Sequence, residues 1–255
     1  MKINLKIARR EYERGAFLLA VKFSQYALAE DPDDAFAWLT LGHSLLKLHD
    51  RIGSIDALEN AAVLQPLDTA SRVELAIAYG AVGRKSLSRD LLMMVATSKQ
   101  ATAPEMLRIA AALEAVDEPI LAMEACRQAG KISPETPEVH YQMGYYAQMT
   151  GHPASVSEAL MRHAIDLDPA NIHFRIGLAS LLIRLGRQCE AIAVLERAIP
   201  SRLDEITCEC CLRRIANLFF DRDDLHRARL CAVRLADIQS SAATSSLSPD
   251  TVATP

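Results

Sequence analysis

The sequence predicts an all-α solenoid, in which helix-turn-helix units of about 34 residues follow one another along the chain. Three observations support this prediction. Half of the 255 residues are apolar but only 5% are aromatic, and much of the apolar share is Ala and Leu, which favour helices. Prolines recur at intervals of about 34 residues or twice that. Glycines and alanines recur with the same period, each at its own position within the repeat.

The prolines mark the ends of the predicted units. Pro32, Pro66, Pro134 and Pro169 each follow an apolar, Ala-rich stretch, and the intervals between them are 34, 68 and 35 residues. Because proline cannot continue a helix, each of them is expected to lie at a boundary. Four other prolines are expected near helix starts, where the missing N–H breaks no helical hydrogen bond: Pro104, Pro119, Pro137 and Pro153.

Glycine and alanine mark the inside of each unit. Glycine is expected where the first helix stops, because it adopts the left-handed conformation at little steric cost: Gly15, Gly83, Gly151 and Gly186. Alanine is expected in the second helix, where a small side chain allows two helices to approach closely: Ala27, Ala61, Ala129, Ala164 and Ala198.

The register divides the chain into a solenoid over 1–238 and a tail over 239–255. Extra residues between Ser201 and Thr207 precede the last unit. The tail is rich in Ser, Thr and Ala, lacks apolar bulk and is expected to be disordered. The predicted units are 1–34, 35–68, 69–102, 103–136, 137–171, 172–205 and roughly 209–238.

Composition excludes several classes of protein. A net charge of -4 without a basic stripe argues against nucleic-acid binding. No stretch of eighteen apolar residues predicts a membrane span, and residues 1–10 lack the apolar core of a signal peptide. Three of the six cysteines lie close together and the other three are scattered, which is not the framework of a small secreted domain, so we expect reduced thiols and a cytoplasmic location.

Motifs of catalysis are not found in the sequence, so we expect no enzyme, no catalytic residue and no cofactor. The one local oddity is Cys208-x-Cys210-Cys211, with Cys231 predicted on the partner helix. The paired C-x-x-C elements of structural zinc sites are absent. Thiols buried in a helix interface behave as small hydrophobic groups, so packing is expected here, with metal or redox chemistry as the alternative.

The second unit carries a resemblance to a known family. It reads Trp38-x-x-Leu41-Gly42-x-x-Leu45, then Ser54-x-x-x-Leu58, then Pro66. This pattern resembles the tetratricopeptide repeat (TPR), and weaker copies follow in nearly continuous register along the chain. The resemblance implies a right-handed α-solenoid of about seven TPR units, stabilised by contacts between neighbouring units.

The resemblance also implies where a partner binds. In TPR proteins the first helix of each unit lines a concave groove, through fixed positions of the repeat. An apolar groove with a few polar groups suits an extended or helical segment, and tyrosines are common anchors. Transferred to this chain, the positions give the candidate groove residues Leu39, His43, Val73, Ile77, Leu107, Arg108, Tyr141, Tyr145, Ile176, Arg213 and Asn217. For Leu39, Val73 and Ile77, packing between adjacent first helices is the alternative.

The expected function is therefore a non-catalytic scaffold that binds a peptide or helix of a partner protein in the groove. The alternative is a regulatory or assembly subunit that acts beside an enzyme on another chain. A homo-oligomer formed through a terminal unit is compatible with both.

Overall fold

A computed structural model shows helices throughout the part of the chain that it describes, which comprises residues 3–98, 100–196, 199 and 201–245. The helices are α1(Ile3–Glu13), α2(Phe17–Glu30), α3(Ala35–Lys47), α4(Arg51–Leu64), α5(Thr69–Ala81), α6(Lys85–Thr97), α7(Ala103–Ala115), α8(Pro119–Ile132), α9(Pro137–Met149), α10(Ala154–Leu167), α11(Ile172–Arg184), α12(Gln188–Glu196), α13(Glu209–Phe220) and α14(Leu225–Ser245). A short 3-10 helix, η1(Leu203–Glu205), precedes α13. The predicted all-α solenoid of helix pairs is confirmed.

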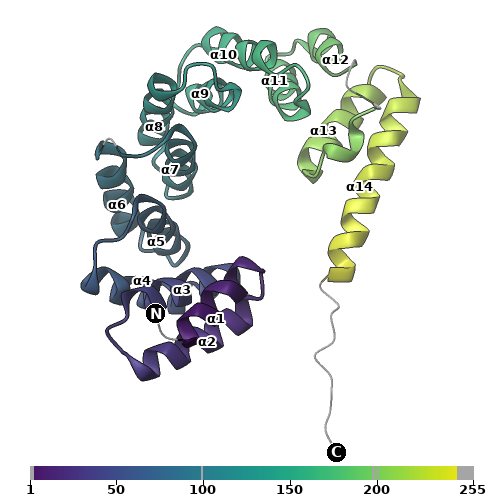
Figure 1. The fold of residues 1–255 in the computed structure, drawn as a ribbon. Coiled ribbons are helices and arrows are strands. Elements are labelled where there is room, and N and C mark those ends of the chain that lie inside the picture. Colours follow the sequence, from purple (N-terminus) through teal and green to yellow (C-terminus); the bar gives the residue numbers. More distant parts are fainter. Residues whose placement is uncertain (1–2, 99, 197–198, 200, 246–255) are drawn as a thin grey trace, which may run out of the picture. The chain divides into compact units, whose positions relative to one another are not determined.

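The helices form two compact units, Met1–Pro134 and Glu135–Pro255. In the first unit, α1–α2, α3–α4, α5–α6 and α7–α8 each pack as an antiparallel pair (Figure 1). In the second, the pairs are α9–α10, α11–α12 and α13–α14. The first six pairs fall within predicted repeat ranges, and α14 of the last pair extends beyond its range. The division into two units was not predicted.

Four helices of the first unit, α3, α4, α5 and α7, begin at a side chain that accepts backbone N–H groups. Asp34 caps α3 through the N–H groups of Phe36 and Ala37, at 3.0 and 3.1 Å. Thr102 and Glu105 form a reciprocal capping box at the start of α7. Such caps satisfy N–H groups that have no partner inside the helix, and each typically contributes about 1 kcal/mol. The predicted helix-start prolines lie in the first turns of α7, α8 and α9, or immediately before α10.

Helix ends follow the predicted glycine pattern. Gly15, Gly83, Gly151 and Gly186 have φ between +75° and +84°. In three repeats without glycine at this place, another residue adopts the same left-handed conformation: His49, Asp117 and Asp223, with φ between +59° and +68°. The turn geometry is therefore common to the repeats, while the residue that adopts it varies.

The core of the second unit is one apolar cluster shared by its helix pairs. It includes Ile172 and Leu182 of α11, Leu195 of α12 and Phe219 of α13, all 1% exposed or less. Two of the extra residues before the last helix pair join this cluster, because Leu203 in η1 and Ile206 directly after it are both buried. These two side chains attach the insertion between Ser201 and Thr207 to the core.

The C-terminal segment differs from its prediction. Helix α14 continues to Ser245, beyond the expected start of the tail at residue 239. The composition explains the difference, because Ala is a strong helix former and no Gly or Pro interrupts the segment before Pro249. The rest of the predicted tail, residues 246–255, lies outside the described part of the chain.

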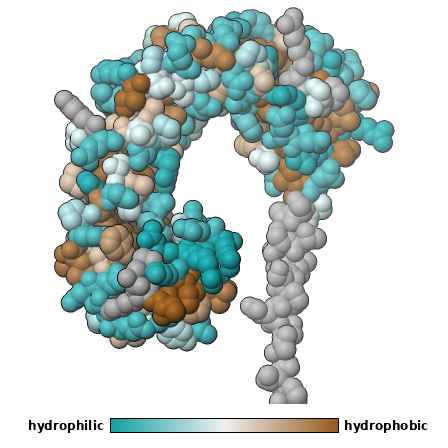
Figure 2. All heavy atoms as spheres, viewed as in Figure 1, coloured by the Kyte–Doolittle hydropathy of each residue, from teal (hydrophilic) through white to brown (hydrophobic). Residues whose placement is uncertain are grey.

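Hydrophobic residues reach the surface at several separate places on the face drawn in Figure 2. Among the exposed apolar side chains are Leu18 of α2, Phe36 of α3, Ile52 of α4 and Phe220 of α13, which are 55–76% exposed. Isolated apolar side chains are normal on a protein surface, so these residues do not by themselves mark a binding site. None of the helices in the described residues is long and apolar enough to cross a membrane.

Candidate partner-binding site

The first helices of the first unit are joined by a row of polar side chains, which we call the polar ladder: Tyr12 of α1, His43 of α3, Glu74 of α5 and Arg108 of α7. The rings of Tyr12 and His43 lie 6.2 Å apart. His43 Nε2 lies 3.4 Å from Glu74 Oε2, and Arg108 Nη2 lies 3.6 Å from Glu74 Oε1. The ladder brings the predicted groove residues His43 and Arg108 together through Glu74, which is also at a groove position of its own repeat.

The polar ladder is half exposed. The side chains of His43 and Glu74 are 25% and 22% exposed, and that of Arg108 is 47% exposed. Ion pairs at this exposure stabilise a fold by only about 0.2–1 kcal/mol. Their main consequence is to orient charged groups on one surface, where a partner can reach them.

A pocket of about 330 Å³ lies beside one end of the ladder. Phe36, Leu39, Thr40 and His43 of α3 form one side of it. The other lining residues come from α1 and from the residue that caps α5: Arg9, Tyr12, Glu13 and Asp68. Apolar and charged groups of both signs therefore meet in one cavity.

Hydrogen bonds and burial set the electrostatics of this pocket. Asp68 accepts the N–H of Ser71 at 2.7 Å, and Ser71 Oγ lies 3.1 Å from His43 Nε2. Burial alone would raise the pKa of the Asp68 carboxyl. The hydrogen bonds from Ser71 and the charges of His43 and Arg72 outweigh burial, so this pKa is lowered. Burial, followed by the charge of Glu74, raises the pKa of Tyr12.

The other predicted groove residues of the first unit differ in accessibility. Ile77 is 39% exposed, and Leu107 is half-buried. Leu39 lines the pocket and also packs against the core cluster of α4 and α5. Val73 is fully buried, so it packs between helices and presents no surface to a partner. For Val73 the packing alternative holds.

In the second unit the two predicted groove tyrosines, Tyr141 and Tyr145, differ in burial. Tyr141 packs against the core cluster, with its ring 5.0 Å from that of Phe174. Burial, followed by the charge of Cys211, raises the pKa of Tyr141. Tyr145 is 38% exposed, and its ring lies 5.2 Å from that of Tyr146. Tyr145 therefore presents surface that a partner could contact, whereas Tyr141 is partly buried and packs against the core.

The remaining predicted residues of the second unit are also divided. Ile176 is 5% exposed and belongs to the core cluster, so it is a packing residue like Val73. Arg213 and Asn217 are exposed on α13. Asn217 lines a mostly apolar pocket of about 380 Å³ together with Phe220 and Leu225. Each unit therefore has accessible groove candidates of its own.

The candidate groove residues did not include Phe36 and Asp68, which both line the first pocket. Phe36 is at the second position of its repeat, one of the family's groove positions, so the repeat register itself indicates this residue. Asp68 is at the end of a repeat, outside every groove position, and reaches the pocket because it caps α5. An Asp directly before a helix is a recognisable capping signal, although capping does not say which surface the carboxylate faces.

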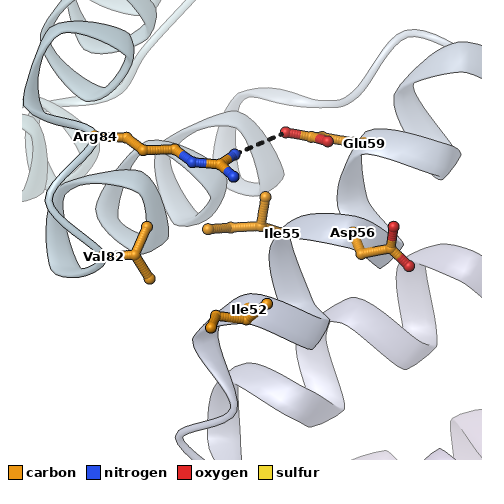
Figure 3. Close-up of a pocket in the computed structure, with 6 residues that line it drawn as sticks. All are labelled: Ile52, Ile55, Asp56, Glu59, Val82 and Arg84. Atoms are coloured by element: carbon orange, nitrogen blue, oxygen red, sulfur yellow. Dashed lines mark ion pairs between the residues drawn. The ribbon is translucent and has the colours of Figure 1, made fainter.

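Another pocket of the first unit lies on the side of the second helices (Figure 3). Ile52, Ile55, Asp56 and Glu59 of α4 line it, and Val82 and Arg84 close it from the turn between α5 and α6. Arg84 Nη1 lies 3.7 Å from Glu59 Oε1, as drawn in Figure 3. This pocket has about 390 Å³ and is a competing place for a ligand.

No protein-family model matches the sequence, and no curated protein matches it. Solved structures do match. A tetratricopeptide-repeat protein from Parabacteroides merdae covers 92% of this chain and 91% of its own, with 11% identity and a TM-score of 0.73. MamA from Desulfovibrio magneticus RS-1 covers 67% and 98%, with 16% identity and a TM-score of 0.59. Another MamA structure covers 66% and 96%, with 18% identity and a TM-score of 0.58. At these identities the likeness is one of fold, and this chain has the fold of a tetratricopeptide-repeat solenoid.

Proposed function

We propose that this protein is a non-catalytic scaffold that binds a peptide or helical segment of a partner protein along the first helices of its repeats. The pocket bounded by Phe36, Leu39 and Asp68 carries this proposal, because it joins an apolar wall to charged groups at the end of the polar ladder. Concave sites with apolar walls and a few oriented polar groups are typical of binding sites. A cytoplasmic location is part of the proposal.

The chemistry of the pocket indicates the kind of segment that would bind. The apolar wall suits one anchor side chain, such as an aliphatic or aromatic residue, and such anchors supply much of the binding energy at interfaces. Arg9 and Glu13 at the pocket, and Arg108 further along the ladder, offer both signs of charge. A segment with one apolar anchor and flanking charged residues of both signs would fit.

The test compares two exposed apolar residues of the first unit. Phe36 lines the pocket of the first helices, and Ile52 lines the pocket on the side of the second helices. Partners are first recovered by pull-down with the full chain and identified by mass spectrometry. Phe36→Ala should then weaken binding of the recovered partner at least tenfold, about 1.4 kcal/mol. Ile52→Ala, in the pocket of Figure 3, is the matched control and should leave binding unchanged.

The opposite result, with binding lost in Ile52→Ala and kept in Phe36→Ala, would place the partner on the second helices. Neither variant is expected to unfold the chain, because Phe36 and Ile52 are 55% and 76% exposed. If the recovered partner is an enzyme whose activity changes on binding, the protein is a regulatory subunit rather than a passive scaffold.

A further inference from the structure

Three cysteine thiols converge at the start of α13. The sulfur atoms of Cys208, Cys210 and Cys211 all lie within 4.8 Å of one another. Cys208 Sγ and Cys210 Sγ are 2.8 Å apart, and Cys208 Sγ accepts the N–H of Cys211 at 3.4 Å. We call these three residues the thiol cluster. Three sulfur atoms at this separation can contact one atom placed between them.

The thiol cluster is more exposed to solvent than the two cysteines that pack in the protein interior. Cys126 and Cys231 are both fully buried, as expected of thiols that pack as small hydrophobic groups. In contrast, Cys208 and Cys210 are exposed, and only Cys211 is partly buried against the core cluster. The packing prediction is therefore wrong for Cys208 and Cys210, because side chains in solvent gain nothing from packing.

The spacing of the thiols matches what a soft metal ion requires. A zinc–sulfur bond of about 2.3 Å in tetrahedral geometry places neighbouring sulfur atoms roughly 3.8 Å apart. The observed spread, from 2.8 Å to at most 4.8 Å, brackets that separation, so small side-chain rotations would suffice. Thiolates are preferred ligands of zinc and other thiophilic ions.

The position in the fold also favours the anionic form of the ligands. Cys208 is the N-cap of α13, where the unpaired N–H groups and the helix dipole stabilise negative charge.

We propose that Cys208, Cys210 and Cys211 bind one thiophilic metal ion such as Zn²⁺ as a three-thiolate site. Binding replaces three S–H bonds by three sulfur–metal bonds and releases three protons to the solvent. The resulting Zn²⁺ complex has a charge of one negative unit. Its fourth coordination position faces solvent, since Cys208 and Cys210 are exposed.

The experiment uses the full reduced chain, kept under a reductant that lacks thiols. Titration with Co²⁺ should produce the thiolate-to-cobalt charge-transfer absorption, with one equivalent bound per chain at every protein concentration. Zn²⁺ should then displace the Co²⁺. Because protons compete with the metal, apparent affinity for Zn²⁺ should fall as the pH is lowered. Bound Zn²⁺ should also raise the melting temperature by mass action.

Variants locate the site. Cys208→Ser and Cys210→Ser should each weaken Zn²⁺ binding at least tenfold. Cys189→Ser is the matched control, because Cys189 is an exposed thiol of the same unit outside the thiol cluster, and it should bind Zn²⁺ normally. Circular dichroism establishes that the variants fold, which is expected because the replaced thiols are exposed.

Three results would overturn the proposal. The first is the lack of a thiolate charge-transfer band in the fully reduced chain. The second is an equal loss of binding in Cys189→Ser. The third is half an equivalent of metal per chain with affinity that rises with protein concentration, because the ion would then bridge two chains.

Discussion

The ring of Tyr141 lies directly against Gly177. A Cβ atom placed on Gly177 would be 2.4 Å from both Cε2 and the hydroxyl oxygen of Tyr141. Tyr141 belongs to α9 and Gly177 to α11, so this contact joins the first helices of two successive repeats. The glycine is in the middle of a helix, where it costs about 1 kcal/mol relative to Ala, and the close approach of the ring explains its presence.

The first prediction concerns this contact. Gly177→Ala gains about 1 kcal/mol of helix propensity but displaces a packed ring, which typically costs about 1–3 kcal/mol, so the net effect should be destabilising. Tyr141→Ala should destabilise by roughly 2–4 kcal/mol through the cavity that it leaves. In the Tyr141→Ala background, Gly177→Ala should become stabilising, because the clash is gone.

Urea denaturation of the four proteins in this double-mutant cycle measures the coupling energy. Tyr145→Ala is the matched control, because Tyr145 is 38% exposed, and it should destabilise less than Tyr141→Ala. Additive effects of the Tyr141 and Gly177 changes would show that the two residues are not coupled.

Most of the fold could be predicted from the sequence because repeats impose the same local solution many times. The proline and glycine phases follow from backbone geometry, and backbone geometry depends little on neighbouring elements. Residues such as Gly83 and Gly151 therefore have the predicted left-handed φ. The end of α14 and the helical turn η1 were missed, because neither repeats elsewhere in the chain.

The candidate site could be predicted only in part. A position within the repeat says which side of its own helix a residue occupies, but not how closely the next helix covers it. Leu39 and Val73 belong to the same predicted groove, yet Leu39 lines a pocket and Val73 is fully buried. Tyr141 and Tyr145 also differ, because Tyr141 packs against the core while Tyr145 is 38% exposed. Contacts between repeats decide these outcomes, and a single repeat does not encode them.

The second prediction concerns the left-handed turn residues. Gly83→Ala should destabilise by about 1 kcal/mol, because Ala disfavours φ of +84°. No heavy atom of the described residues lies within 4 Å of the Cβ that Ala would add, so the loss would report backbone conformation and not a clash. His49→Gly, at φ of +62°, should have the opposite sign. Thermal melts check both, and a Gly83→Ala variant as stable as the parent would contradict the assigned turn.

The third prediction concerns a buried hydroxyl. Ser88 of α6 is fully buried. Its Oγ is among the buried hydroxyl oxygens that have no hydrogen-bond partner in the described residues. Burial of a hydroxyl without a partner costs about 1–3 kcal/mol, so Ser88→Ala should stabilise the fold.

The control for Ser88 is another buried serine of the same unit. Ser71 is 2% exposed, but its Oγ lies 3.1 Å from His43 Nε2. Ser71→Ala should therefore lower the free energy of unfolding, while Ser88→Ala raises it. Urea denaturation of the two variants measures the difference, and equal effects of the same sign would show that hydrogen bonding is not the cause.

The last prediction uses a charge network inside the second unit. Arg187 forms ion pairs with Glu158 of α10 and with Glu190 of α12, and Arg162 Nη2 lies 2.7 Å from Glu158 Oε1. The Glu158 side chain is only 15% exposed. The hydrogen bond from Arg187, supported by Arg162, outweighs desolvation and lowers the pKa of Glu158 below its ordinary value of 4.5.

The sign of the pH dependence follows from this lowered pKa. A carboxylate with a lower pKa in the folded chain stabilises the fold above its unfolded pKa, and this contribution disappears as the pH falls through the folded pKa. Glu158→Gln should therefore melt at a lower temperature than the parent at pH 7, and the gap should close as the pH falls below 4.5. Glu138→Gln, on the exposed surface of α9, should show no such gap. A difference between parent and Glu158→Gln that stays constant from pH 7 to below 4.5 would mean that Glu158 acts through its shape and not through its charge.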